Sequence, residues 1–381
     1  DSSAVEQFKV TPDIYPRGIV RVAAIFIVAG VIFSFFNLPS LFFAILLPIV
    51  GLLTFWAGMF KRKAWFGWAY KKQTSHNSFG RINPLPTNSD GVAPVQILVG
   101  GHLDSAYEMN IADNEKYFVP ITVAGIGFGI IMILLCLIKA ILLLAIPSSI
   151  ILIIAPNGYL VFTGIDICQI VVIVVLGPCF ARVVRGYGFG KPVLGANDNL
   201  AGVGVACAVG KHFTEPHLHY VELVVGGFGS EEIGDRGAEA YAHIHGSKAE
   251  QKNTIVVVPE SCGAGYALAV VEKEKMHGAT HDPQLCGILM EAYNRYKNNT
   301  PEPIPCDIRT LGFAGTDAGP FSLAGFRATA IVGIAGVMNK PAHWHSRHDT
   351  PDNLDATFLQ AVIDIICHFV EMVEEKQGLL A

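Results

Sequence analysis

Five short motifs combine imidazole and carboxylate side chains, the groups that bind transition metals and move protons in proteins. These motifs are Gly101-His-Leu-Asp-Ser105, Gly195-Ala-Asn-Asp-Asn199, Gly229-Ser-Glu-Glu-Ile-Gly234, Pro259-Glu260 and His343-Trp-His-Ser-Arg-His-Asp-Thr-Pro-Asp352. In the first motif, His102 can bind a metal while Asp104, two residues on, holds the other ring nitrogen. In the second motif, Asp198 can bridge two cations, because each carboxylate oxygen can bind one of them.

The other three motifs supply further carboxylates and imidazoles. Glu231 and Glu232 are adjacent and point in different directions, so one can bind a metal while the other faces a reacting water. Glu260 adds one more carboxylate after an apolar run. The last motif offers three histidines, which are His343, His345 and His348. Such a set suits zinc, cobalt or manganese, and two metals sharing a carboxylate can promote hydrolysis of a carbonyl compound.

Each motif alone also fits an ordinary structural role. A single histidine such as His102 is often a structural residue, and Asp198 can cap the start of a helix. The two adjacent glutamates fit an exposed turn, and Glu260 fits a surface loop. The combination favours a metal site, because all of these residues are expected in loops of one domain.

The elements around the motifs alternate between short apolar strands and helices. Strands are expected at Val95–Val99, Tyr220–Val225, Thr254–Val258 and Ala328–Ile334. Helices are expected at Leu200–Phe213, Ala238–His245, Pro283–Lys297 and Ala356–Lys376. This alternation predicts an α/β sheet with helices on both faces, and sites in such sheets form at the carboxyl ends of the strands. Most of the polar motifs follow a predicted strand directly.

Charge is missing from two long stretches of the chain. Charged residues make up 15% of the 381 residues, which excludes a disordered chain and a nucleic-acid binder driven by basic charge. Residues 22–60 carry no charge, and residues 118–181 carry only Lys139 and Asp166. A spanning helix needs about 20 apolar residues. We therefore expect about four transmembrane helices in two hairpins, at Ile19–Phe36, Leu41–Phe60 and roughly 120–144 and 160–182.

These stretches divide the chain into five parts. They are an N-terminal segment 1–18, a first hairpin 19–60, a first part of the soluble domain 61–117, an inserted hairpin 118–183 and a second part of the domain 184–381. The second block must cross an even number of times if both flanks belong to one domain. A re-entrant block that does not span is the alternative. Lys139 and Asp166 are costly in a bilayer, so they are expected to snorkel, to pair or to line a polar pocket.

Basic residues gather beside the ends of the hairpins that adjoin the soluble domain. They are Lys9, Arg17, Arg21, Lys61, Arg62, Lys63, Lys71, Lys72, Arg182, Arg185 and Lys191. The opposite loops, 37–40 and 146–158, have none. The positive-inside rule therefore predicts an integral, multi-pass membrane protein with its soluble domain on the cytoplasmic side. The opposite orientation stays open, because large folded domains can override loop charge.

Taken in order, the motifs resemble the signatures of the co-catalytic zinc exopeptidases. The matching segments are Gly101–Ser105, Gly195–Asn199, Ser230–Gly234, Gly315-Thr-Asp-Ala-Gly-Pro320 and His345-Ser-Arg-His-Asp-Thr350. That family includes bacterial leucyl aminopeptidases, glutamate carboxypeptidase II and the endoplasmic-reticulum metallopeptidases with membrane spans, which face the lumen. The resemblance covers residues 94–117 and 190–376, and it implies a mixed central sheet and a peptide substrate.

The resemblance also implies roles for the site residues. Two zinc ions are expected, with Asp198 as the bridging ligand and Glu231 as the general base. The remaining ligands implied are His102 and Glu260 for one zinc, and Glu232 and His345 for the other. The family more often has Asp where Glu260 stands, and its His-Ser/Thr-x-x-Asp-Thr pattern selects His345 over the neighbouring histidines. It further implies a cis peptide bond between Asp198 and Asn199.

One departure from the family is the length of chain between the first two ligands. His102 and Asp198 stand 96 positions apart, whereas a short loop separates them in the family, and the inserted hairpin accounts for the difference. Peptides or small proteins near a lipid bilayer are therefore the expected substrates, and no nucleic acid is expected as a partner. The alternatives are a single-zinc acyl transferase of the glutaminyl cyclase type, a non-catalytic binding relative and, from Lys139 and Asp166 alone, a transporter.

Overall fold

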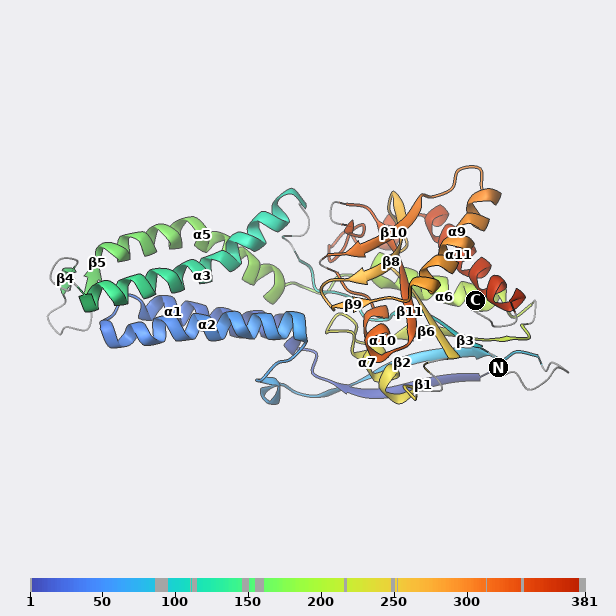
Figure 1. Ribbon diagram of the computed structural model, residues 1–381, viewed down its shortest axis with the longest axis horizontal. Helices are drawn as coiled ribbons and strands as arrows, with labels where there is room; N and C mark the ends of the chain where they lie inside the picture. The colour runs from blue at the N-terminus through green and yellow to red at the C-terminus, as the bar shows by residue number, and fades with distance from the viewer. Residues whose placement is uncertain are drawn as a thin grey trace. The chain divides into compact units, whose positions relative to one another are not determined.

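A computed structural model describes residues 2–376 apart from short gaps at 86–94, 110, 112–114, 146–150, 155–160, 216–217, 248–250, 252, 313 and 337–338. The chain forms two compact units, seen in Figure 1 as a helical part and a part built on a sheet. The sheet unit comprises Asp1–Pro12, Lys72–Ala106 and Pro192–Ala381. The helical unit comprises Asp13–Lys71 and Tyr107–Lys191.

In the described part of the chain, the sheet unit is built on a mixed nine-stranded sheet. Its strands, in spatial order, are β1 (Ser2–Val10), β2 (Gln73–Ile82), β6 (Val221–Phe228), β3 (Val95–His102), β7 (Thr254–Glu260), β11 (Arg327–Ile334), β8 (Ala267–Glu274) and β10 (Cys306–Leu311), with β9 (Ala279–Thr280) paired to β8. The four central strands β6, β3, β7 and β11 are mutually parallel. Their carboxyl ends therefore lie at one edge of the sheet.

Helices cover both faces of this sheet, as the sequence predicts. One face carries α6 (Ala201–His212), α9 (Pro283–Asn299) and α11 (Ala356–Glu375), and the other carries α7 (Arg236–Ile244) and α10 (Ala318–Ala324). Alternate residues of β3 serve the two cores: Ile97 and Val99 pack under α6, and Leu98 packs on the opposite face. This alternation follows from the period of two along a strand.

The described part of the helical unit contains four long apolar helices. They are α1 (Ile19–Phe33), α2 (Leu38–Lys61), α3 (Glu115–Ala145) and α5 (Gly164–Gly188), and a short hairpin of β4 (Ile151–Ile154) and β5 (Val161–Thr163) connects α3 to α5. The unit also includes short turns at Ile14–Gly18 and Gly67–Ala69. The first hairpin turns at residues 34–37 rather than 37–40, because Pro39 fits the first turn of a helix, where its missing N–H is not needed.

Within the described residues, five helices are long and apolar enough to cross a membrane by length and composition. Four of them are the helices of the helical unit, the first including residues from Ile14 onwards. The fifth is α11, whose apolar side chains, such as Phe358 and Phe369, are fully buried in the core of the sheet unit. Length and composition alone therefore do not distinguish α11, a core helix of the sheet unit, from the four helices of the helical unit.

Lys139 and Asp166 pair with each other inside the helical unit. The Lys139 Nζ atom lies 2.8 Å from Asp166 Oδ1 and donates to the Ser34 carbonyl at 2.7 Å. The other carboxylate oxygen of Asp166 accepts from the backbone N–H and the hydroxyl of Thr163, at the start of α5. Both charged side chains are fully buried. Of the three expected outcomes, pairing is the one found.

The chain leaves and re-enters the sheet unit at neighbouring points. Val10, near the first exit, pairs with Gln73 in the antiparallel β1–β2 ladder. At the second exit, Val193 donates its backbone N–H to the carbonyl of Ala106 at 3.0 Å. Each excursion into the helical unit therefore returns close to the residue at which it began, and at the first exit the two flanks are neighbours in the sheet.

Candidate metal centre

The sheet brings three motifs to one edge. His102 is the last residue of β3, Glu260 is the last residue of β7, and Glu231 and Glu232 follow the end of β6. Because β3 lies between β6 and β7 and runs parallel to both, these side chains converge at the carboxyl edge of the sheet. Strand order alone thus explains why residues more than a hundred positions apart meet.

Asp198 reaches the same edge from an irregular turn, Ala196–Leu200, just before α6. The carboxylate of Asp349 holds this turn by accepting the backbone N–H groups of Asn197 at 2.5 Å and Asp198 at 3.1 Å. The peptide bond between Asp198 and Asn199 is cis, as the family resemblance implies. The Asn199 side chain donates to Glu260 Oε2 at 2.8 Å and so connects this turn to the end of β7.

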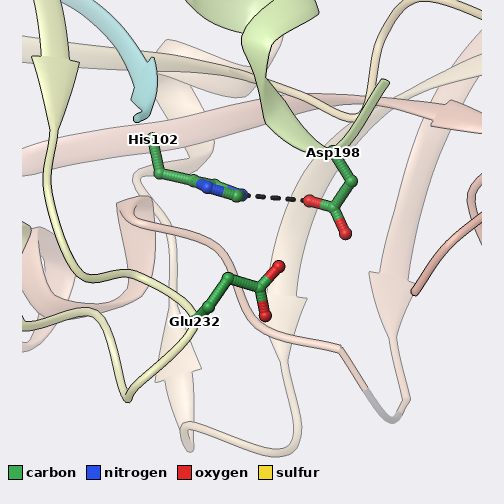
Figure 2. Close-up of side chains that lie close together, drawn as sticks. All are labelled: His102, Asp198 and Glu232. Carbon is green, nitrogen blue, oxygen red and sulfur yellow. Dashed lines mark hydrogen bonds and ion pairs between the residues drawn. The ribbon is translucent and has the colours of Figure 1, made fainter. Parts of the chain in front are cut away.

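The two oxygens of the Asp198 carboxylate face different partners. Oδ1 lies 3.0 Å from His102 Nε2, and Oδ2 lies 3.5 Å from His345 Nε2. Glu260 Oε1 lies 3.7 Å from the same nitrogen of His102, and Glu232 Oε2 lies 3.3 Å from that of His345. Figure 2 shows how His102, Asp198 and Glu232 lie around a common space. One ligand atom from each of these three residues lies within 4.8 Å of the others.

The polar atoms of the cluster fit a metal better than they fit one another. Among the described residues, Asp198 Oδ2 and Glu232 Oε1 are buried without a hydrogen-bond donor. Buried carboxylate oxygens normally have a donor or a cation, so such atoms point to a missing positive partner. Imidazole and carboxylate together are the ligand set of zinc and related metals. The residues present therefore fit divalent metal ions.

His102 presents the correct ring nitrogen to such an ion. Its Nδ1 atom lies 2.8 Å from the backbone carbonyl of Asp104. A carbonyl only accepts, so Nδ1 carries a proton, and Nε2, which contacts Asp198 Oδ1, is the nitrogen whose lone pair a metal would take up in place of a proton. The sequence motif predicted the Asp104 carboxylate in this role, but that group stands 3.8 Å from Nδ1 and accepts from Glu231 and Glu232 instead.

The Asp104 carboxylate instead supports the paired glutamates. It accepts the backbone N–H groups of Glu231 at 2.9 Å and Glu232 at 3.1 Å. These two bonds orient the turn after β6 so that Glu232 faces His345, while Glu231 Oε2 lies 3.8 Å from His102 Nε2. The two adjacent side chains thus point to different partners, as expected from their sequence.

Burial and crowded negative charge shift the acidity of the cluster. Burial raises the pKa of Glu231 well above its usual value, and it raises the pKa of Glu260 to about 7. Burial acts against protonation of His102, but the nearby carboxylates outweigh it and raise the pKa of this imidazole. The raised pKa values mean that these side chains bind protons readily, and a divalent metal that binds to the cluster would displace protons from its ligands.

Of the three histidines in the last motif, the structure brings His345 to the cluster. Its ring lies against that of Trp344, with centroids 4.1 Å apart and the two planes tilted by 31°. His343 is half-buried, and burial lowers its pKa with a further contribution from His348. In the described part of the chain, neither of these two histidines makes an ion pair with Asp198 or Glu232. His345 is thus the histidine of this motif that lies beside Asp198 and Glu232, and its role as a metal ligand stays a prediction.

Two site residues carried no assigned role in the sequence analysis. Asp349 lies within the last motif, and only the folded chain shows that it holds Asn197 and Asp198. Asp317 belongs to the Gly315–Pro320 motif and is fully buried, with both carboxylate oxygens lacking a hydrogen-bond donor among the described residues. Position within these motifs was the signal that could have found both.

The fold is an α/β domain with a candidate metal site at the carboxyl edge of its sheet. The chain belongs to peptidase family M28, whose model matches residues 181–370. A comparison with curated protein sequences finds no match.

Solved structures similar to this chain include a zinc aminopeptidase from Bacillus subtilis, at 16% identity and a TM-score of 0.47 over 81% of this chain and 55% of that one. An aminopeptidase from Aneurinibacillus is similar at 16% identity and a TM-score of 0.46, over 80% and 49% of the two chains. A peptidase M28 precursor from Shewanella amazonensis is similar at 15% identity and a TM-score of 0.42, over 79% and 45%. The chain spans about half the length of these structures.

Proposed function

We propose that the chain is a membrane-anchored, zinc-dependent exopeptidase that acts as an aminopeptidase and binds two zinc ions. The observation that carries this proposal is the position of Asp198, whose two oxygens face two separate imidazole–carboxylate pairs. In this assignment His102 and Glu260 hold one ion, His345 and Glu232 hold the other, and Asp198 bridges them. A single-metal site would not need a carboxylate shared in this way, which favours two metals over a single-zinc acyl transferase.

The chain's own residues supply the proton transfers of peptide hydrolysis. When bound, the two ions polarise the carbonyl group and stabilise the negative charge of the transition state. Glu231 lies beside the cluster without serving as one of the five proposed ligands, so its carboxylate is placed to take the proton of the attacking water. It then donates that proton to the amine that leaves. The Asp104 carboxylate accepts the backbone N–H of Glu231 and so holds Glu231 in position.

We further propose that the helical unit spans the membrane four times, with the sheet unit on the cytoplasmic side. The length and composition of its four apolar helices and the burial of its two charged residues as a pair support the spans. The basic residues beside the domain-side helix ends support the orientation. Peptides that reach the membrane surface are the substrates proposed.

The test combines metal analysis with a peptide library. Protein purified without chelator should contain about two zinc ions per chain, the number expected of a site with a bridging carboxylate. It should release N-terminal residues from the library, and a chelator should abolish this activity. One zinc per chain with cyclisation of N-terminal glutamine would instead identify the acyl transferase, and absence of transition metal would exclude the proposed mechanism.

A further inference from the structure

A second group of buried titratable side chains lies behind the turn that carries Glu231. It consists of Asp235, Glu274, His277 and His281. His277 lies in the turn between β8 and β9. It belongs to none of the five sequence motifs. All four side chains lie in the sheet unit, and none of them is among the five proposed metal ligands.

His277 stands between two carboxylates. Its Nδ1 atom lies 2.7 Å from Glu274 Oε2, and its Nε2 atom lies 3.5 Å from Asp235 Oδ2. A Cβ atom added at Gly315 or Gly319 would overlap the imidazole ring or the Glu274 carboxylate, so both glycines leave room for the pair. Although burial opposes ionisation, contacts with His277 and His281 lower the pKa of Glu274 to about 2. The ionised Glu274 carboxylate therefore attracts the imidazole of His277.

Asp235 connects this imidazole to the proposed catalytic turn. Its backbone N–H donates to the carbonyl of Glu231 at 2.7 Å, and Gly234 donates to the same carbonyl at 2.7 Å. The turn is therefore held by Asp104 at its start and by Asp235 at its end. Asp235 also has a left-handed backbone (φ 51°), a conformation that is uncommon for non-glycine residues, although aspartate adopts it more readily than most.

We infer that His277 is a positioning residue, which holds Asp235 and through it sets the place of the Glu231 carboxylate. This inference rests on the proposed role of Glu231 as the general base. It assigns a function in catalysis to a histidine that contacts neither the proposed metal ligands nor, in the proposed mechanism, the substrate. The contact that matters is the charge contact from Nε2 to Asp235 Oδ2 at 3.5 Å, and the approach of Nδ1 to Glu274 Oε2 at 2.7 Å limits where the ring can lie; both are ion-pair contacts by distance rather than hydrogen bonds.

Two conservative substitutions separate the contacts. The amide nitrogen of glutamine reaches close to the place of Nε2, and that of asparagine reaches close to the place of Nδ1. His277→Gln should therefore keep the donor to Asp235 and most of kcat. His277→Asn should keep only the donor to Glu274 and lower kcat on the order of tenfold or more, with KM and zinc content unchanged.

His281→Asn is the matched control. This imidazole also contacts Glu274, at 3.2 Å, but its other nitrogen faces Ser322 rather than Asp235. It should lower the melting temperature about as much as His277→Asn does and leave kcat unchanged. Equal losses of kcat in both asparagine variants would overturn the inference, because the effect would then follow stability. Equal losses in His277→Gln and His277→Asn would overturn it as well.

Hydrogen exchange gives a readout that does not depend on turnover. The backbone N–H groups of Gly234 and Asp235 should exchange faster in His277→Asn than in the unmodified chain, and not in His281→Asn. If the unmodified chain hydrolyses no peptide but this exchange pattern holds, the proposed function fails while the anchoring role stands. If peptide hydrolysis is intact and exchange of the turn is the same in all variants, the anchoring role fails on its own.

Discussion

At the level of single residues, the two adjacent glutamates have different proposed roles, Glu231 as the general base and Glu232 as a metal ligand. Glu231→Gln should keep both zinc ions and lower kcat by about 10²- to 10⁴-fold, since an amide cannot accept the proton of the attacking water. Glu232→Gln should instead lower zinc content, because Glu232 Oε2 faces His345 in the proposed second metal position. Elemental analysis and kcat, measured on the same preparations, check both outcomes. Equal loss of metal in the two variants would void the assignment.

Metal affinity should depend on pH through Glu260. Burial raises the pKa of this carboxyl to about 7, so in the metal-free protein it binds a proton below that pH. A proton and a metal ion compete for the same oxygens, and zinc affinity should therefore fall as the pH falls from 8 to 6. Competition with a chelator of known affinity measures the effect.

Glu260→Gln provides the comparison for this pH effect. The variant should bind zinc more weakly at pH 8, because a neutral amide is a poorer ligand, and its affinity should change less between pH 8 and pH 6. An unchanged pH dependence in Glu260→Gln would show that other carboxyl groups account for the competition.

At the level of elements, the buried Lys139–Asp166 pair connects α3 to the start of α5. Lys139→Leu would leave the carboxylate buried without its cation and should destabilise the helical unit by about 3–5 kcal/mol. Adding Asp166→Asn removes the charge but keeps an oxygen that can accept from Thr163, so the double variant should recover much of the loss. Thermal unfolding in detergent compares the two. If the double variant were no more stable than Lys139→Leu, the loss of stability would not come from the unpaired charge of Asp166.

The strands that sequence patterns predicted are the central parallel ones. β3, β6, β7 and β11 are short apolar runs, because helices bury both of their faces. The outer strands β1 and β2 carry many polar and exposed side chains, and their pattern does not stand out from a loop. These two segments are strands because β1 pairs with β2 and β2 pairs with β6, and not because of their local composition.

At the level of the whole molecule, the proposed topology predicts where cysteines can be labelled. A cysteine at Ser149, in a segment outside the described residues, should react with an impermeant thiol reagent in intact cells, because it would lie on the outer side. One at Asn298, exposed on α9 of the sheet unit, should react only after the membrane is disrupted. The chain without either addition sets the background. Labelling at Asn298 alone in intact cells would invert the orientation.

The sequence by itself determined the class of fold and the proposed ligands. The apolar runs locate the central strands, and the position of a polar motif after a strand places it at the carboxyl edge of a sheet. Both are local properties, readable over a few residues. His102, Glu231, Glu232 and Glu260 could therefore be singled out before any contact was known, and family resemblance selected His345.

Only the tertiary structure decided which groups support these residues. Asp104 contacts His102 through its backbone carbonyl and the glutamate turn through its carboxylate. Asp349 holds a turn about 150 positions away, and His277 reaches Asp235 from a separate hairpin. Such contacts join residues that are distant in the chain, and they depend on strand order and on how the loops cross the sheet. No local pattern encodes those distances, because they arise from the packing of the whole domain.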